Sequence, residues 1–231
     1  MKRKIFSLFI AVQLAMGIML TGCSGEKKNV AESKESVSQE KDEYFVWFLD
    51  GKGLGGLTDE GKKQEKLVIP SNCEKLMGSI VTSDSDVKEI SFEGTVDSDF
   101  DSGSLVSSGT KIEKVEYPEG MTKLISSSLS REENLVSVVL PSSLTEISAY
   151  CINNCNSLEN INLEDTNVST IGEYAFQHCD SLKEVRLPSS IKEIGEFAFP
   201  SSIEDVYIPK DAELSKYNYN NFPNTDGTVN I

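Results

Sequence analysis

Basic residues and histidine are scarce in this chain. Its 231 residues include 22 Lys and Arg against 37 Asp and Glu, giving a formal net charge of −15, and His178 is the single histidine. Nucleic-acid binding and adsorption to an anionic lipid surface both need clustered Lys and Arg, so the acid excess argues against both. One histidine and scattered cysteines also lack the two closely spaced ligand pairs of a structural zinc site. We expect no cofactor and no metal.

The chain has only one long apolar run, near its N-terminus. Ile5–Leu20 follows the basic Lys2-Arg3-Lys4 and is short for a membrane span, which needs about 20 apolar residues. It ends in Leu20-Thr21-Gly22-Cys23, which resembles the bacterial lipobox. We therefore predict a lipoprotein signal peptide over 1–22 and a lipid on Cys23, with the membrane reached through this lipid only. An ordinary secretory signal or an uncleaved anchor would equally place the remaining residues outside the cytoplasm.

The segment after the signal lacks aromatic residues. Mixed charges with Ser and Gln cannot bury enough surface to become ordered, so we predict a disordered tether over 23–43, spanning roughly 25 Å. Tyr44–Leu49 then gives six consecutive apolar residues, including the only Trp. We predict a buried strand here and a glycine-rich flexible turn after it, together forming an N-terminal cap over 44–66.

The rest of the chain repeats one short phrase. Its four clearest copies begin at Leu135, Leu158, Leu182 and Ile203, which are 23, 24 and 21 residues apart. The phrase alternates apolar and polar residues over a strand length and most often closes with proline. Earlier copies begin at Leu67, Val87 and Ile112, so the array has seven coils. A fixed period in this range predicts a solenoid.

The repeating unit explains how the coils would stack. In L-x-x-I-x-L the apolar side chains point to one side, and the proline then ends the strand and turns the chain. Ala and Phe of the second half return to the interior from the opposite side. No unit can bury its own apolar face, so neighbouring units must make one continuous core. We predict a mainly β solenoid with one short parallel strand per coil, connected by short turns or helical turns.

The block A-F-x-x-C-x-S-L at Ala175–Leu182 resembles the BspA-like leucine-rich repeat family of bacterial surface proteins. The resemblance covers about 70% of the chain, from Leu57 onward. Glu132 stands at the cysteine position of an earlier copy, and Glu164 follows Leu163 where other copies have proline. The period stops after Pro209. We therefore assign the solenoid to 67–209 and a polar C-terminal cap to 210–231.

A glycine pattern within the cap matches the dinucleotide-binding fingerprint. Gly51, Gly53 and Gly56 follow a predicted strand, as the fingerprint requires. The fingerprint also needs a helix that starts at its last glycine, and the charged segment that follows offers no apolar helical stripe. We interpret the glycines as a turn.

An acidic loop resembles a calcium-binding loop. Asp97, Asp99 and Asp101 are spaced as in a calcium loop, but Ser102 and Ser108 stand where an EF-hand needs Gly and Glu. Asp84 and Asp86 nearby would support a calcium site, but we favour a solvated acidic loop. A calorimetric titration without heat at millimolar Ca²⁺ would exclude a weak site.

The cysteines could support catalysis, a disulfide or neither. A nucleophilic pair of Cys179 and His178 would need both side chains to face each other, whereas the repeat points the cysteine inward. We assign no catalytic residue. Cys155 and Cys179 share one repeat position on adjacent coils, so an extracytoplasmic disulfide between them is sterically conceivable. The simpler interpretation, which we favour, is that these thiols, with Cys73 and Cys151, are buried small apolar groups.

The outward strand positions are the candidate partner-facing residues. The last variable position of each phrase forms a column that contains Ser91, Glu116, Val139, Asn162, Arg186 and Tyr207. Tyr and Arg are enriched at protein interfaces, although strand exposure alone would also account for the column. We predict that Val139, Asn162, Arg186 and Tyr207 face a partner.

Together these features predict a membrane-anchored, monomeric repeat protein that binds a protein or other surface macromolecule. The resemblance implies adhesion or recognition. A structural lipoprotein that binds a partner in its own membrane is the alternative, and a hydrolase with two acidic residues ranks below it.

Overall fold

The computed structural model describes residues 40–49, 51–98, 100, 105–215 and 229–230. The predicted signal peptide, Cys23 and residues 24–39 lie outside these ranges, as does most of the predicted C-terminal cap. The described residues all belong to one compact unit. Within the described part, no helix has the length and apolar character needed to cross a membrane.

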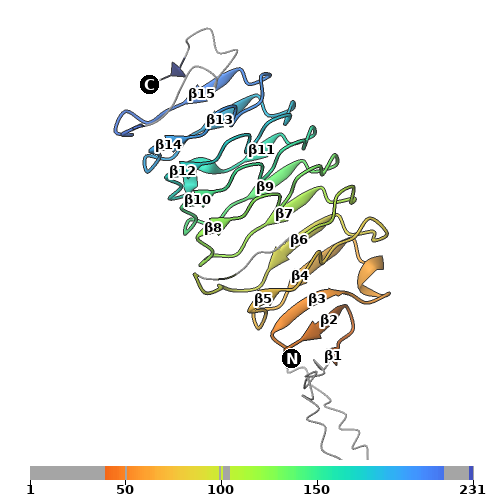
Figure 1. The fold of residues 1–231 in the computed structure, drawn as a ribbon. Helices are drawn as coiled ribbons and strands as arrows, with labels where there is room; N and C mark the ends of the chain where they lie inside the picture. Colours follow the sequence, from red (N-terminus) through yellow and green to blue (C-terminus); the bar gives the residue numbers. More distant parts are fainter. Residues whose placement is uncertain (1–39, 50, 99, 101–104, 216–228, 231) are drawn as a thin grey trace, which may run out of the picture. The chain divides into compact units, whose positions relative to one another are not determined.

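Seven short strands, one per coil, form the first strand column of the solenoid (Figure 1). They are β4 (Lys66–Ile69), β6 (Glu89–Phe92), β7 (Lys114–Glu116), β9 (Ser137–Val139), β11 (Asn160–Ile161), β13 (Glu184–Arg186) and β15 (Asp205–Tyr207). Neighbours in β4-β6-β7-β9-β11 and in β13-β15 pair in parallel. The predicted seven-coil parallel solenoid is therefore confirmed.

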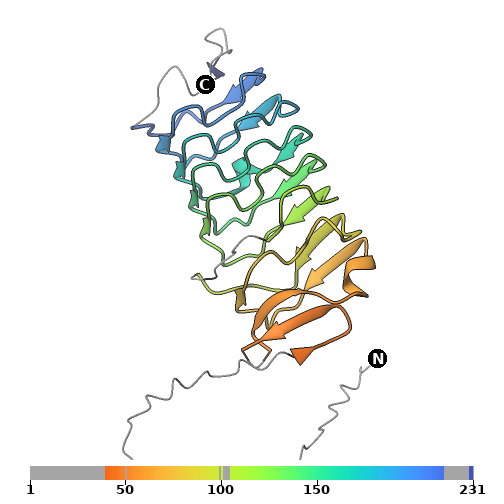
Figure 2. The same cartoon turned by 45° about the vertical axis from the view of Figure 1, so that its right-hand side comes forward.

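A second strand column runs along the other side of the coils (Figure 2). It consists of β8 (Lys123–Leu124), β10 (Glu146–Ile147), β12 (Thr170–Ile171) and β14 (Glu193–Ile194), paired in parallel in that order. The repeat pattern predicts one strand per coil, whereas the structure has this second column as well. Its strands are only two residues long, too short for an alternating pattern to be recognised in the sequence.

The core lies between the two columns. Val138 of the first column and Ile147 of the second are both buried, and the same holds for Val185 and Ile194 further along. Each such side chain removed from water contributes about 1.5–3 kcal/mol. Strand β13 shows the underlying pattern, because Val185 is buried while its two neighbours are exposed. Pro188 follows and ends the strand, as the repeat predicts.

The N-terminal cap is a hairpin, which corrects the predicted glycine-rich turn. Strand β2 (Phe45–Phe48) pairs antiparallel with β3 (Gly53–Leu57), so the glycines predicted to form a turn belong largely to a strand. At Gly55 a Cβ would collide with the ring of Phe48, so glycine is what allows this ring to pack over β3. Strand β3 then pairs in parallel with β5 (Lys75–Leu76), which joins the cap to the first coil.

Order also begins earlier than predicted. Strand β1 (Glu40–Lys41) pairs antiparallel with β2, although both residues fall in the predicted tether. Asp42, also in that segment, accepts a 2.7 Å hydrogen bond from the indole Nε1 of the buried Trp47. Such a charge-assisted bond fixes the chain ahead of β2. The predicted strand ends at Phe48, because Leu49 is exposed and has a positive φ of 54°.

The C-terminal end of the first strand column is covered by β16 (Val229–Asn230). It pairs in parallel with β15 through Val206↔Val229 and Tyr207↔Asn230. An otherwise open strand edge is thereby paired, which is the function we assigned to a C-terminal cap.

The close stacking of the coils predicts different effects for substitutions at two glycines. A Cβ added at Gly172 would collide with the backbone of Ala149 in the preceding coil, whereas a Cβ at Gly56 meets nothing within 4 Å. We expect Gly172→Ala to lower the free energy of unfolding by about 1–3 kcal/mol, and Gly56→Ala to leave it nearly unchanged. Thermal melting followed by circular dichroism measures both. Equal melting temperatures for the two variants would contradict the close stacking.

Candidate functional site

Outward side chains of the first strand column form the predicted partner-facing surface. In register, Glu116 lies beside Val139, and Arg186 lies beside Tyr207. Glu116 and Arg186 are exposed, while Val139 and Tyr207 are partly buried. The two pairs lie on either side of the fifth coil, which interrupts the column.

Asn162 is oriented differently from the other column residues. Its side-chain Oδ1 accepts a 2.7 Å hydrogen bond from the backbone N–H of Leu140, and its Nδ2 donates one of 3.1 Å to the Leu140 carbonyl. Both ends of the amide therefore bind the preceding coil. The side chain of Asn162, which was predicted to face a partner, is therefore hydrogen-bonded to the backbone of the fold.

A short 3₁₀-helix breaks the sheet at this coil. The helix η2 (Leu163–Asp165) follows Asn162 directly, at the place where other copies of the repeat have proline. The first strand column is divided here, because its sheet ends at β11 and a separate sheet begins with β13. The departure at Glu164 seen in the sequence thus marks an interruption of the strand ladder.

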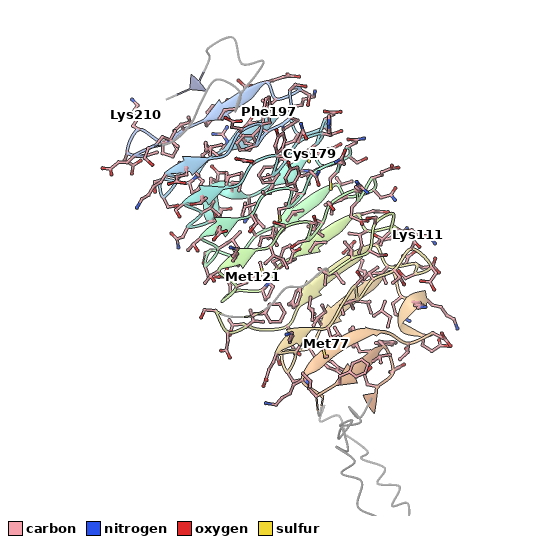
Figure 3. All side chains as sticks on the ribbon, viewed as in Figure 1. Met77, Lys111, Met121, Cys179, Phe197 and Lys210 are labelled. Atoms are coloured by element: carbon pink, nitrogen blue, oxygen red, sulfur yellow. The ribbon has the colours of Figure 1, made fainter. Side chains whose placement is uncertain are left out.

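A groove of about 530 Å³ lies beside this break. Its lining residues are Glu164, Arg186, Leu187, Tyr207, Ile208, Pro209 and Lys210. They come from η2, from β13 and β15, and from the turn that follows β15, where Figure 3 labels Lys210. The groove combines apolar walls with one aromatic ring and charges of both signs, a composition typical of recognition surfaces.

Arg186 is the most constrained side chain of the groove. Its guanidinium carbon lies 4.0 Å from the centre of the Tyr207 ring, and its Nη2 is 2.7 Å from Oε1 of Glu184. Cation–π stacking and the ion pair hold the planar group in one orientation. A guanidinium has five N–H donors, so donors remain for a ligand after the bond to Glu184.

A second hollow, of about 550 Å³, lies where the cap meets the first coils. Its lining includes Lys52 and Glu74, which form an ion pair of 2.6 Å, together with Cys73 and Phe100. One of its two lysines and one of its two carboxylates therefore pair with each other. None of the predicted partner-facing residues lines it, so we centre the site on the groove.

The side chains of Cys179 and His178 are separated, in agreement with the rejection of a nucleophilic pair. His178 is exposed and has a positive φ of 59°, whereas Cys179 is buried. Consecutive residues that point to opposite sides of the coil cannot exchange a proton directly. The glycine fingerprint likewise lacks its helix, because β3 occupies that segment.

The acidic loop is only partly described. Asp97 is within the described ranges, whereas Asp99 and Asp101 are not. The supporting acids are already paired: Asp84 lies 2.7 Å from Lys62, and Asp86 lies 2.6 Å from Lys111. The hydrogen bond from Lys62, with a further one from Thr82, lowers the pKa of Asp84 to about 2. Among described residues, no three His, Cys, Asp or Glu side chains are grouped to hold a metal ion.

Buried thiols form part of the stacking between coils. Sγ of Cys155 donates a 2.9 Å hydrogen bond to the carbonyl of Leu129, and Sγ of Cys179 donates one of the same length to Ile152. Each acceptor belongs to the preceding coil. The four described cysteines are free thiols. The disulfide between Cys155 and Cys179 stays the alternative to the buried thiols that we favour.

Glu132 takes the cysteine position one coil earlier. It is fully buried, and its Oε2 accepts hydrogen bonds from the backbone N–H and the hydroxyl of Thr110. Its carboxylate thus joins its own coil to the preceding one, as the thiols do. Burial raises the pKa of Glu132, because charge is poorly solvated in the core.

Comparison with known proteins agrees with the repeat. A family model described as the BspA type leucine rich repeat region matches residues 103–227 in six copies, which is more than half of the chain. No curated protein matches the chain significantly.

Three solved structures of repeat proteins are similar to this chain. A leucine rich repeat protein of T. pallidum is 23% identical, covering 75% of this chain and 69% of that one, with a TM-score of 0.46. Pneumococcal vaccine antigen PcpA is 20% identical over 65% of this chain, with a TM-score of 0.41, and the match spans only 32% of the antigen. A leucine rich cell surface protein from Faecalibacterium prausnitzii is 13% identical, covering 75% and 80%, with a TM-score of 0.38.

The buried thiols should be unreactive in the folded protein. Burial raises the pKa of Cys73 to about 11 and that of Cys151 further, and the hydrogen bond with Cys155 together with burial raises that of Cys179. At pH 8 these groups therefore stay protonated. In a Cys23→Ser variant, we expect slow reaction with a thiol reagent until denaturant exposes four thiols. Only two thiols in denaturant without reductant would instead establish a disulfide.

Proposed function

We propose that this chain, which belongs to the BspA-type leucine-rich repeat family, is an extracytoplasmic protein that binds a protein or other surface macromolecule. The bound partner would contact the outer face of the first strand column, around the groove beside η2. The proposed role is adhesion or recognition by a monomer, without catalysis and without nucleic acid.

The observation that carries this proposal is the stacking of Arg186 on Tyr207 at the edge of the groove. Arg and Tyr are the residue types that dominate binding energy at interfaces. Here both belong to short strands with ladder partners on the neighbouring coil, so little side-chain and backbone freedom is left to lose on binding. Leu187 and Ile208 supply an apolar surface next to the two polar groups.

The site gives less support to a hydrolase. A glycosidase-type mechanism needs two carboxyl groups about 5–9.5 Å apart across the substrate. Of the described residues that line the groove, Glu164 alone carries a carboxylate. Glu184 lies nearby but is bound to Arg186. A binding role therefore accounts for the groove better than acid–base chemistry does.

We further propose that the protein is held on a bacterial membrane through a lipid on Cys23. The support is the basic start, the apolar run and Leu20-Thr21-Gly22-Cys23 at its end. Each lipid CH₂ buried in the bilayer contributes about 0.8 kcal/mol, so several acyl chains hold a protein stably.

Substitution of Cys23 tests the anchor. We expect Cys23→Ser to move the protein from the membrane fraction to the soluble fraction, because no acyl chain can be attached. Mass spectrometry of the N-terminal peptide should show acyl groups on the unsubstituted protein only. The proposal would be wrong if the unsubstituted peptide began at another residue or carried no lipid.

Substitution of the outer face tests the binding proposal. With the purified protein as bait, partners would be captured from the producing cell and, separately, from foreign-cell matrix. A Val139→Ala/Arg186→Ala/Tyr207→Ala variant should bind the recovered partner at least about tenfold more weakly, equivalent to about 1.4 kcal/mol. Lys123→Ala/Thr170→Ala on the second strand column removes the same charge and should not. Full affinity in the triple variant would contradict the assignment.

The source of the partner decides between the two roles. Recovery only from the membrane of the producing cell supports an envelope-assembly role, whereas recovery from foreign-cell matrix supports adhesion.

A further inference from the structure

Three aromatic rings stack along the outside of the solenoid, away from the groove. Tyr150, Tyr174 and Phe197 occupy one repeat position on successive coils, shortly after β10, β12 and β14 respectively (Figure 3 labels Phe197). The ring centres are 4.9 Å and 5.4 Å apart, with interplanar angles of 16° and 12°. We call these three residues the outer aromatic ladder.

The core does not need this ladder. A separate inner pair, Phe176 and Phe199, already stacks at 5.4 Å between the last two of these three coils and is fully buried. Tyr150 by contrast is 43% exposed, and Tyr174 and Phe197 are partly exposed. A row of large aromatic side chains left at the surface of a protein is a common feature of interaction sites.

The backbone makes the aromatic residues still less expected. All three have positive φ values, 56°, 57° and 52°, a region that bulky L residues rarely adopt. Ser127 occupies the same position one coil earlier with a φ of 63°, so the coil itself imposes the conformation. A small residue is therefore tolerated there, and the rings are not required to form the turn.

Acidic groups flank the outer aromatic ladder. The backbone N–H of Tyr150 donates to the carbonyl of Glu173, and that of Tyr174 donates to the carbonyl of Glu196, each at 3.0 Å. Each tyrosine is thus held beside an exposed glutamate of the next coil. Between residues 124 and 182 the sequence has eight Asp and Glu but only one basic residue, Arg131.

These features define the chemistry of the partner. The stacked rings cover one another's faces, so there is no row of exposed ring faces against which a flat sugar ring could pack. The edges of the rings and the face of Tyr150 toward Ser127 stay available, and both suit the alkyl stems and guanidinium planes of basic side chains. The adjacent carboxylates suit their charged ends.

We propose that the outer aromatic ladder, with Glu173 and Glu196, is a second interaction surface that binds a basic, extended segment of a partner protein. Lys or Arg stems pack on the rings while their charged ends reach the glutamates. The residues of this surface follow the strands of the second column in the chain, and none of them lines the groove. Either proposal can therefore fail while the other stands.

A labelled peptide tests the proposal directly. The probe is a ten-residue peptide of alternating Arg and Ser, and its binding to the full chain carrying Cys23→Ser is followed by fluorescence anisotropy. We expect binding that Tyr150→Ser/Tyr174→Ser, which copies Ser127, weakens by about tenfold. Glu173→Gln/Glu196→Gln leaves the rings in place and should weaken it by at least about threefold. An alternating Glu and Ser peptide should not bind.

A charge-matched control separates this surface from general attraction to an acidic protein. Glu133→Gln/Glu159→Gln removes the same charge elsewhere on the coils, and both residues are exposed. Unchanged peptide affinity in this control supports the proposal. Equal weakening in the control, no effect of the tyrosine substitutions in a variant with an unchanged melting temperature, or absence of binding to the Arg peptide would each overturn it. Binding of an N-acetylglucosamine oligomer through the same tyrosines would overturn it in favour of a glycan.

Discussion

Parallel pairing between successive coils is the constraint on which the rest of the structure depends. Strands in a sheet lie about 4.8 Å apart, so every coil must repeat the path of the previous one within that spacing. Gly172 and Gly195 meet this demand by having no side chain where the coils are closest. Cys155 and Cys179 meet it by donating to carbonyls of the preceding coil. The residue type at each of these positions is thus constrained by the backbone of the preceding coil.

The same constraint explains where candidate sites arise. A residue that breaks the repeat must be accommodated locally, as Glu164 is when η2 replaces the usual turn and the first strand column divides. The groove lies at that division, and Arg186 and Tyr207 form one of its sides from the coils that follow. The outer aromatic ladder is the opposite case, because there the repeat itself places the same kind of side chain on three coils.

The solenoid could be predicted from the sequence, because the periodic Leu, Ile and Pro residues are the ones that determine how the coils stack. The cap was harder to predict, because a glycine such as Gly55 is typical of turns. In the structure Gly55 lies in strand β3, where the absence of a side chain leaves room for the ring of Phe48. The sequence could not show that Asn162 would bind the backbone of Leu140. Nor could it bring Glu164 and Lys210 to one groove, since their proximity follows from the path of the coils.

We propose that a partner binds across the division of the first strand column. Hydrogen–deuterium exchange of the full chain, measured with and without a captured partner, would show this contact. We expect slower exchange in the complex for the amides of 163–165, 184–187 and 207–210, with unchanged exchange in the cap hairpin. Unchanged exchange in those three segments, with protection elsewhere on the coils, would contradict it.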